Sequence, residues 1–284
     1  WPCPEGPVAA NGVLRRAVKG AAVAADAVHR PPRGLVVLIY HRVGGASGLE
    51  LDLPVDLFAA QAEALAASRR VVSLGEALGW LGRPDNGRNT GGVEDPVVIT
   101  FDDGTADFVE HALPILERDR LPVTLYAATA FIDEGRPFPG DGVPLSWRGL
   151  ADACATGLVD VGSHTHGHRL LDRLPPDQVG EELGRSIGLI GEHLGRPPLD
   201  FAYPKAVAGS AAADAAVRRS FRSAALGGSR PNPAGATDPY RLARSPIQRS
   251  DAMRWFERKL EGGMAAEERL RRLVNRWRYA GDTT

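Results

Sequence analysis

Apolar runs of strand character alternate along the chain with segments of helical character, and this alternation restricts the fold more than any other feature. The run GLVVLIY (34–40) is continuously apolar and rich in β-branched residues, as in strands buried on both faces, and PVVITF (96–101) predicts a second strong strand. We predict further strands at 122–128, 158–163, 199–204 and 221–226, and a short one at 70–74. Helices are predicted at 54–68, 108–119, 146–157, 175–195, 210–220, 250–260 and 265–278.

Strands that alternate with helices form parallel βαβ units, and the sequence therefore predicts an α/β fold. Six or seven such units in 284 residues favour a single barrel over two domains. We expect an N-terminal extension at 1–33 and one barrel domain at 34–284. The alternative is an open doubly wound sheet. No GxGxxG motif follows the first strand and no GxxxxGK[ST] motif occurs, so nucleotide binding has no support.

The composition excludes several classes of protein. A net charge of −1 gives no basic footprint, so we expect no nucleic-acid partner. No apolar run approaches the roughly 18 residues of a membrane span. The two cysteines, Cys3 and Cys154, are too far apart in sequence to suggest a disulfide framework. The chain begins at Trp1, and we expect the natural N-terminus, with any signal peptide, to precede it.

Polar and titratable side chains follow four of the predicted strands. Because the carboxyl ends of parallel strands meet on one face of an α/β fold, we expect these side chains to form a single site. Each segment taken alone would be a weak signal, and the coincidence of four is the evidence. The residues are His41, Asp102, Asp103, His164, His166, His168, Tyr203, Pro204 and Lys205.

The segment GSHTHGH (162–168) places three of the seven histidines within five residues, which indicates a metal site. His164 and His168 share a face both on an extended chain and on a helical turn. Two histidines and one carboxylate leave positions open for water and substrate, as in catalytic zinc, Fe(II) or Co(II) sites. The alternatives are that the adjacent aspartates, Asp102 and Asp103, cap the next helix and that the histidines are structural.

At these motifs the sequence resembles a known family. TFDDG (100–104) followed by SHTHGH (163–168) is similar to the two metal-site motifs of the polysaccharide deacetylases, carbohydrate esterase family 4. VLIYHRV (37–43) and the lead-in LSWRGLADACATGLVDVG (145–162) are typical of the branch with permuted motifs that acts on poly-N-acetylglucosamine. The resemblance covers roughly residues 35–260 and implies a distorted (β/α) barrel with about seven parallel strands.

The resemblance also implies roles for individual residues. Asp103, His164 and His168 would bind a divalent ion, usually Zn²⁺, with Co²⁺ or Ni²⁺ as alternatives. Asp102 would be the general base. His41 would be the acid that protonates the leaving amine, the alternative being a structural residue at the barrel mouth.

The third motif of the family departs from its usual form in this chain. Its arginine is absent from AYPK (202–205), and we expect Arg244 to substitute for it in orienting the base. Tyr203, Pro204, Lys205 and Trp147 are expected to contact substrate, although a role in the core is equally compatible with Trp147.

The implied reaction is metal-dependent hydrolysis of the N-acetyl groups of an amino-sugar oligomer or polymer. The alternatives are a deacylase of the same fold for a small glycoside or other amide, a glycan-binding module with a decayed site and, less favoured, a metal oxygenase. The resemblance implies action in the cell envelope or outside the cell. The oligomeric state is left open by the sequence.

Overall fold

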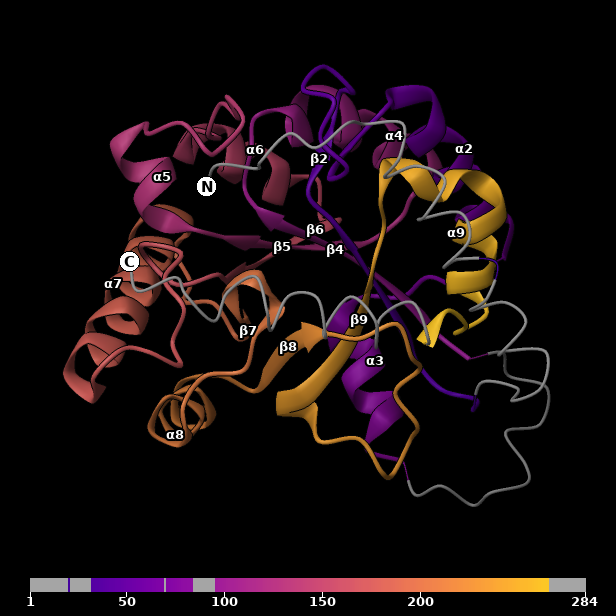
Figure 1. Cartoon of the computed structure of the whole chain (residues 1–284). Coiled ribbons are helices and arrows are strands. Elements are labelled where there is room, and N and C mark those ends of the chain that lie inside the picture. The colour runs from indigo at the N-terminus through magenta and orange to yellow at the C-terminus, as the bar shows by residue number, and fades with distance from the viewer. Residues whose placement is uncertain (1–19, 21–31, 69, 84–94, 266–284) are drawn as a thin grey trace.

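The computed structural model describes residue 20 and residues 32–68, 70–83 and 95–265. In chain order the elements are β1 (Val36–Tyr40), β2 (Arg42–Val43), β3 (Asp52–Leu53), α2 (Val55–Ser68), α3 (Leu74–Leu81), β4 (Val97–Asp103), the π-helical η1 (Phe108–Ala112), α4 (Leu113–Asp119), β5 (Val123–Ala127), α5 (Thr129–Glu134), α6 (Trp147–Ala155), β6 (Val159–Ser163), α7 (Pro176–Leu194), β7 (Asp200–Ala202), the 3-10 turn η2 (Pro204–Ala206), α8 (Ala211–Ser220), β8 (Ser223–Gly227), η3 (Pro239–Arg241), β9 (Leu242–Pro246), η4 (Arg249–Asp251) and α9 (Ala252–Leu260). Seven parallel strands close a barrel in the order β1-β4-β5-β6-β7-β8-β9, with helices around it (Figure 1). The predicted α/β barrel is therefore confirmed.

The barrel is distorted because its strands pair unequally. β1 and β4 are in register over five residue pairs, whereas β6 and β7 share one pair and β1 and β9 share two. The Asn232 side chain completes the short β1–β9 seam. Its Nδ2 donates to the carbonyl oxygens of Leu35 (3.1 Å) and Ala243 (2.9 Å), and its Oδ1 accepts from the Ala243 amide (2.8 Å).

One face of each strand points into the barrel, where apolar residues form an interior cluster. Val37, Val98, Tyr126 and Ala202 belong to this interior cluster, together with Leu74, Ala77 and Leu81 from α3. Helix α3 therefore covers the amino-terminal end of the barrel. Because side chains alternate along a strand, Thr100 and Asp102 of β4 share the inward face of Val98.

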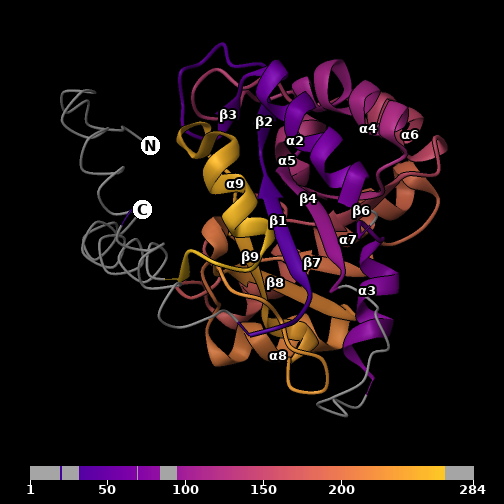
Figure 2. The ribbon, with the colours of Figure 1, turned by 90° about the vertical axis from the view of Figure 1, so that its right-hand side faces the viewer.

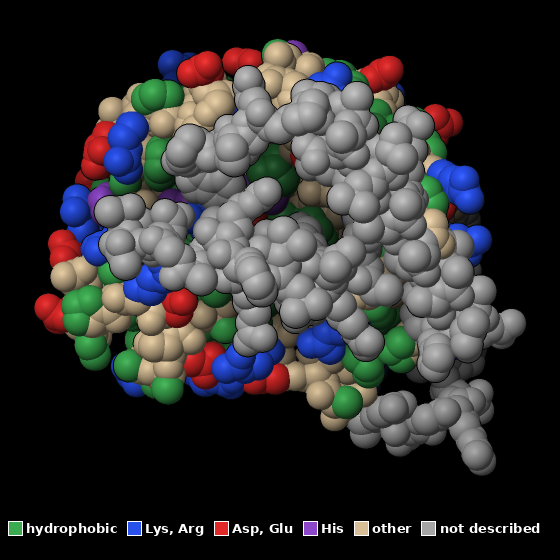
Figure 3. Space-filling model, in the orientation of Figure 1, with side chains coloured by type: hydrophobic (Ala, Val, Ile, Leu, Met, Phe, Trp, Pro, Cys, Tyr) green, Lys and Arg blue, Asp and Glu red, His purple; other side chains and the backbone are tan. Residues whose placement is uncertain are grey.

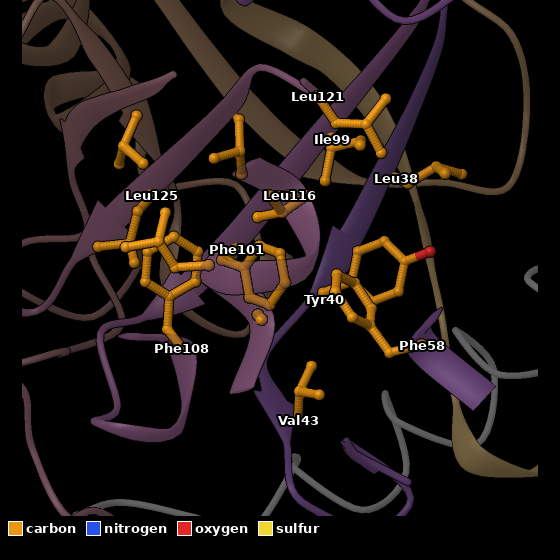
Figure 4. Packing of buried hydrophobic residues seen from close by; sticks show 14 of the residues in the cluster. Leu38, Tyr40, Val43, Phe58, Ile99, Phe101, Phe108, Leu116, Leu121 and Leu125 are labelled. Atoms are coloured by element: carbon orange, nitrogen blue, oxygen red, sulfur yellow. The ribbon is translucent and has the colours of Figure 1, made fainter. Parts of the chain in front are cut away.

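The other strand face packs against the surrounding helices. Leu38, Tyr40, Ile99, Phe101 and Leu125 lie in this cluster with side chains of α2 and α4, as Figure 4 shows. Tyr40 stacks on Phe101 with ring centroids 5.3 Å apart. Helices α2 and α9 contact each other beside β1 (Figure 2). This packing fixes the strand ends from which the candidate site is built.

Two differences from the predicted elements concern strands. The stretch 70–74 is not a strand, because Val71 makes only an isolated bridge to Val97 and Leu74 already begins α3. The seventh strand of the barrel is β9, which the sequence does not predict. Its sequence LARSP lacks the apolar pattern of a buried strand, because Arg244 points into the barrel and pairs there with Asp102.

Other predictions fall on residues that the structure does not describe. Nearly all of the 1–33 extension and the predicted helix at 265–278, apart from its first residue, lie outside the described ranges. Among the described helices, none is long and apolar enough to cross a membrane. Basic and acidic side chains are intermixed on the face shown in Figure 3.

Candidate active site

Asp103, His164 and His168 come together at the carboxyl ends of β4 and β6. The His164 Nε2 lies 3.7 Å from the Asp103 Oδ1, and the His168 Nε2 lies 3.5 Å from the same oxygen. One ligand atom from each residue lies within 4.8 Å of the other two. Ligand atoms around a tetrahedral zinc ion are about 3.3 Å apart, so small adjustments would bring these three to a shared ion.

The two histidines are held in the form that binds metal. Burial, the largest effect on each, lowers the pKa of His164 and of His168 to about 4, so both imidazoles are neutral at neutral pH. The His164 Nδ1 lies 2.8 Å from the carbonyl oxygen of Ala202. A proton on Nδ1 satisfies that carbonyl and leaves the Nε2 lone pair facing Asp103. The donor set therefore fits a divalent ion such as Zn²⁺.

Unusual backbone conformations aim these side chains. Asp103 (φ 76°), Thr165 (φ 64°) and His168 (φ 57°) adopt the left-handed region, which non-glycine residues rarely enter. Gly162 permits the approach of β5, because a Cβ at this position would lie 2.5 Å from the Tyr126 ring. Strain of this kind persists where surrounding contacts enforce it, and it concentrates at functional sites.

Asp102 lies beside this cluster and forms a bidentate ion pair with Arg244. The guanidinium donates to both carboxylate oxygens, at 2.6 and 2.8 Å, and both side chains are almost fully buried. Burial alone would raise the pKa of Asp102, but the charge and hydrogen bonds of Arg244 are the largest of the influences that outweigh it and lower the pKa to about 2. Asp102 is consequently a fixed carboxylate, and its Oδ2 lies 3.9 Å from the His164 Nε2.

His41 follows β1 and is half-buried on the same side of the barrel. It contributes to the lowered pKa of Asp102 and of His168, so it lies near the cluster. Among the described residues, its buried Nδ1 has no hydrogen-bond partner. An unpaired buried nitrogen costs free energy, so it is a candidate for contact with a bound molecule.

The residues predicted to contact substrate differ in whether they can reach it. Tyr203 is 1% exposed, packs in the core against α8 and donates to Asp214, so its ring offers no face to a sugar. Pro204 is also buried. Lys205 remains a candidate, because its charge contributes to lowering the pKa of His168 and it therefore lies near that ring.

Trp147 is the first residue of α6. Its ring stacks on His193 with centroids 4.3 Å apart, and its Nε1 donates to Asp133. The rest of the side chain packs on the core. The structure supports the core role for Trp147 over sugar stacking.

Sequence reasoning missed three buried polar residues that contact the histidine segment from outside the strands. The Thr129 hydroxyl lies 3.0 Å from the His166 Nδ1, so His166 faces α5. Glu182 and Ser186 reach the same segment from α7. A signal for the latter two exists in the sequence, since they fall in helical phase with the apolar residues of α7.

The fold and the clustered residues define a closed (β/α) barrel with a carboxylate–histidine site at the carboxyl ends of its strands. Residues 90–223, a little under half of the chain, match the model of the polysaccharide deacetylase family. The recognition made from the motifs is confirmed. A comparison with curated proteins finds no significant match.

Several solved structures share this fold. The structure of IcaB from Ammonifex degensii superimposes with a TM-score of 0.68 at 26% identity, covering 82% of this chain and 98% of that one. The deacetylase PplD of Streptococcus pyogenes, in complex with acetate, gives 0.66 at 20% identity, covering 80% and 98%. A de-N-acetylase from Aggregatibacter actinomycetemcomitans gives 0.63 at 18% identity, covering 79% and 99%. The last two show the shared fold, and the family supports a deacetylase that acts on glycans.

Proposed function

We propose that this protein is a metal-dependent hydrolase that removes N-acetyl groups from an amino-sugar oligomer or polymer. The observation that carries the proposal is the buried Asp102–Arg244 pair directly beside the Asp103, His164 and His168 cluster. A cation at that cluster would supply Lewis-acid chemistry, polarising the acyl carbonyl and making water more acidic. Asp103, His164 and His168 would hold it.

Asp102 acts as the general base in this proposal. Water that attacks the acetyl carbon must lose a proton, and Asp102 is a carboxylate at every pH at which the histidines are neutral. Arg244 fixes the plane of the carboxylate through two parallel hydrogen bonds, which limits its motion while the proton moves. In this proposal Arg244 orients the base in place of the arginine that is absent from the third motif.

His41 acts as the general acid. The amide nitrogen leaves as an amine only when it is protonated, so the reaction needs a proton donor on the far side of the carbonyl from the base. His41 comes from a different strand than Asp102 and keeps a buried ring nitrogen without a partner among the described residues. That nitrogen supports a role in contact with substrate.

The substrate part of the proposal is supported by the family and by the likeness to IcaB. The contribution of Lys205 to lowering the pKa of His168 supports a contact of this lysine with the sugar at the rim. We extend the proposal to action in the cell envelope or outside the cell, which the family resemblance supports.

The decisive experiment measures bound metal and released amine together. Wild type, Asp103→Ala and Asp102→Asn are purified, loaded with zinc, and incubated with N-acetylglucosamine oligomers. Wild type should hold about one ion and release amine. Asp103→Ala should lose both properties, because it removes a ligand, whereas Asp102→Asn should keep the ion and lose at least about 10²-fold in rate.

Circular dichroism establishes that each variant is folded before the comparison is made. Zinc binding by wild type without amine release from any oligomer would instead favour a small amide substrate. Failure of wild type to retain zinc would overturn the proposed site.

A further inference from the structure

Helix α7 carries two polar side chains on its buried face. This face is formed by Val179, Glu182, Leu183, Ser186 and Ile190, which recur at helical spacing. Glu182 is 8% exposed and Ser186 is fully buried. Burying a carboxylate on the inner face of a helix costs free energy unless hydrogen bonds compensate it, so its contacts indicate what it does.

Both side chains reach the segment that carries the clustered histidines. The Glu182 Oε2 accepts from the Gly167 amide at 2.7 Å, between His166 and His168. The Ser186 hydroxyl lies 2.8 Å from the Ser163 hydroxyl, which in turn accepts from the Thr165 amide. Glu182 and Ser186, one helical turn apart on α7, are therefore hydrogen-bonded near the two ends of the segment 163–168.

This segment needs external support. Thr165 and His168 sit in the left-handed region, which is unfavourable for a residue with a Cβ. Gly167 is tightly fitted against the carboxylate, since a Cβ there would lie 2.9 Å from the Glu182 Oε1. The Glu182 carboxylate therefore occupies the space that a side chain at position 167 would need, and only glycine allows this contact.

We propose that Glu182 is a positioning residue for the metal site, with Ser186 as a weaker second support. Its hydrogen bond to the Gly167 amide holds residues 165–168 in the conformation that turns the His168 Nε2 toward Asp103. Glu182 does not itself belong to the group of converging ligand atoms found among the described residues. The inference rests on the proposed function, in that Asp103, His164 and His168 bind an ion.

Without the Glu182 contact, the segment can relax out of its left-handed conformations, and metal binding must then restore them. Groups that orient metal ligands through hydrogen bonds, without binding the ion, typically contribute 10- to 100-fold in metal affinity. We therefore expect the affinity for zinc to fall by about this factor when the carboxylate is removed.

The test titrates zinc into the metal-free protein in competition with a chromophoric chelator. The variants are Glu182→Ala, Glu182→Gln and Glu182→Asp, and the matched control is Glu181→Ala, an exposed neighbour on the same helix. Glu182→Ala should weaken zinc binding about 10- to 100-fold. Glu182→Gln keeps an acceptor for the Gly167 amide and should recover most of the loss. Glu181→Ala should bind like wild type.

Urea unfolding of the metal-free proteins separates affinity from stability. A merely structural Glu182 would lower the unfolding midpoint and leave the zinc affinity of the folded protein unchanged, and that result would overturn the proposal. If Glu182→Ala does not fold, Glu182→Asp gives the same decision, because its shorter side chain withdraws the carboxylate from Gly167. Unchanged affinity in Glu182→Asp would then overturn it.

Two further outcomes have distinct meanings. Equal losses in Glu182→Ala and Glu182→Gln would refute the hydrogen-bond account. Failure of wild type itself to bind zinc would overturn the proposed function and this inference together, whereas tight binding by wild type and Glu182→Ala alike would overturn only the inference.

Discussion

Arg244 controls the protonation of the buried carboxylate on which the proposed chemistry depends. Burial pushes the pKa of Asp102 upward, and the Arg244 guanidinium is the largest of the influences that bring it down to about 2. An uncompensated carboxylate in the same place would be protonated more readily. Arg244 is itself fully buried, so each member of the pair would be costly to bury without the other.

Replacing Arg244 with methionine should therefore move the acid limb of the pH–rate profile. The active form of Asp102 is the carboxylate, which is lost as the pH falls through its pKa. When Arg244 is removed the pKa rises, so activity should be lost at a higher pH than in wild type. The rate at neutral pH should fall about 10²-fold, because the base is also no longer oriented.

The control for Arg244→Met is Arg241→Met, which removes an arginine paired at the surface with Asp214. It should leave the pH–rate profile of amine release unchanged. An acid limb at the wild-type pH in Arg244→Met would contradict this prediction. It would mean that the pKa of Asp102 without Arg244 stays below about 4, the pKa of His164 and of His168.

At the scale of elements, the closure of the barrel depends on the β1–β9 seam. Only two residue pairs join these strands, and the Asn232 side chain supplies three further hydrogen bonds across the gap. Loss of this side chain leaves buried backbone groups of Leu35 and Ala243 with fewer partners. Each such group costs about 1–3 kcal/mol when it is unsatisfied.

Asn232→Ala should consequently reduce the free energy of unfolding by about 3 kcal/mol. Urea unfolding of the metal-free protein measures this change without a contribution from bound ion. Thr237→Ala is the control, because it removes a single hydrogen bond to Pro233 from the same loop and should cost under about 1 kcal/mol. Similar losses in the two variants would contradict a special role for Asn232 in the seam.

The sequence predicts well those elements whose own residues indicate burial or a helix start. β1 is apolar throughout and β4 begins with three apolar residues, and α6 begins after Ser146, whose hydroxyl accepts from the Gly149 amide. Strand β9 was missed because its inward position holds a charged Arg244, whose burial depends on a partner 142 residues away. Helix α3 was missed although Ser73 and Glu76 form a capping box, a signal that the sequence does contain.

The candidate site shows the same division between local and long-range information. The spacing of His164 and His168 and the order of the motifs predict a cluster that the structure indeed brings together. The positions of Tyr203 and Trp147 depend on neighbours such as Asp214 and His193, which no local pattern identifies.

At the scale of the whole molecule, closure of the barrel assembles the site from distant parts of the chain. His41 follows the first strand, Asp102 lies on the second barrel strand and Arg244 lies on the last. The ligands themselves span β4 and the segment after β6. Because unfolding separates all of these residues, an ion bound at the cluster should stabilise the folded protein as a whole.

Zinc should therefore raise the thermal unfolding midpoint of wild type in a concentration-dependent way. A ligand that binds only the folded state adds about 2.7 kcal/mol at a free concentration one hundred times its Kd. Asp103→Ala should lose this response, because a ligand is missing, while Asp160→Ala, which removes an exposed carboxylate paired with Arg196, should keep it. Differential scanning calorimetry across a zinc series measures the effect, and an equal response in Asp103→Ala and wild type would place the bound ion elsewhere on the protein.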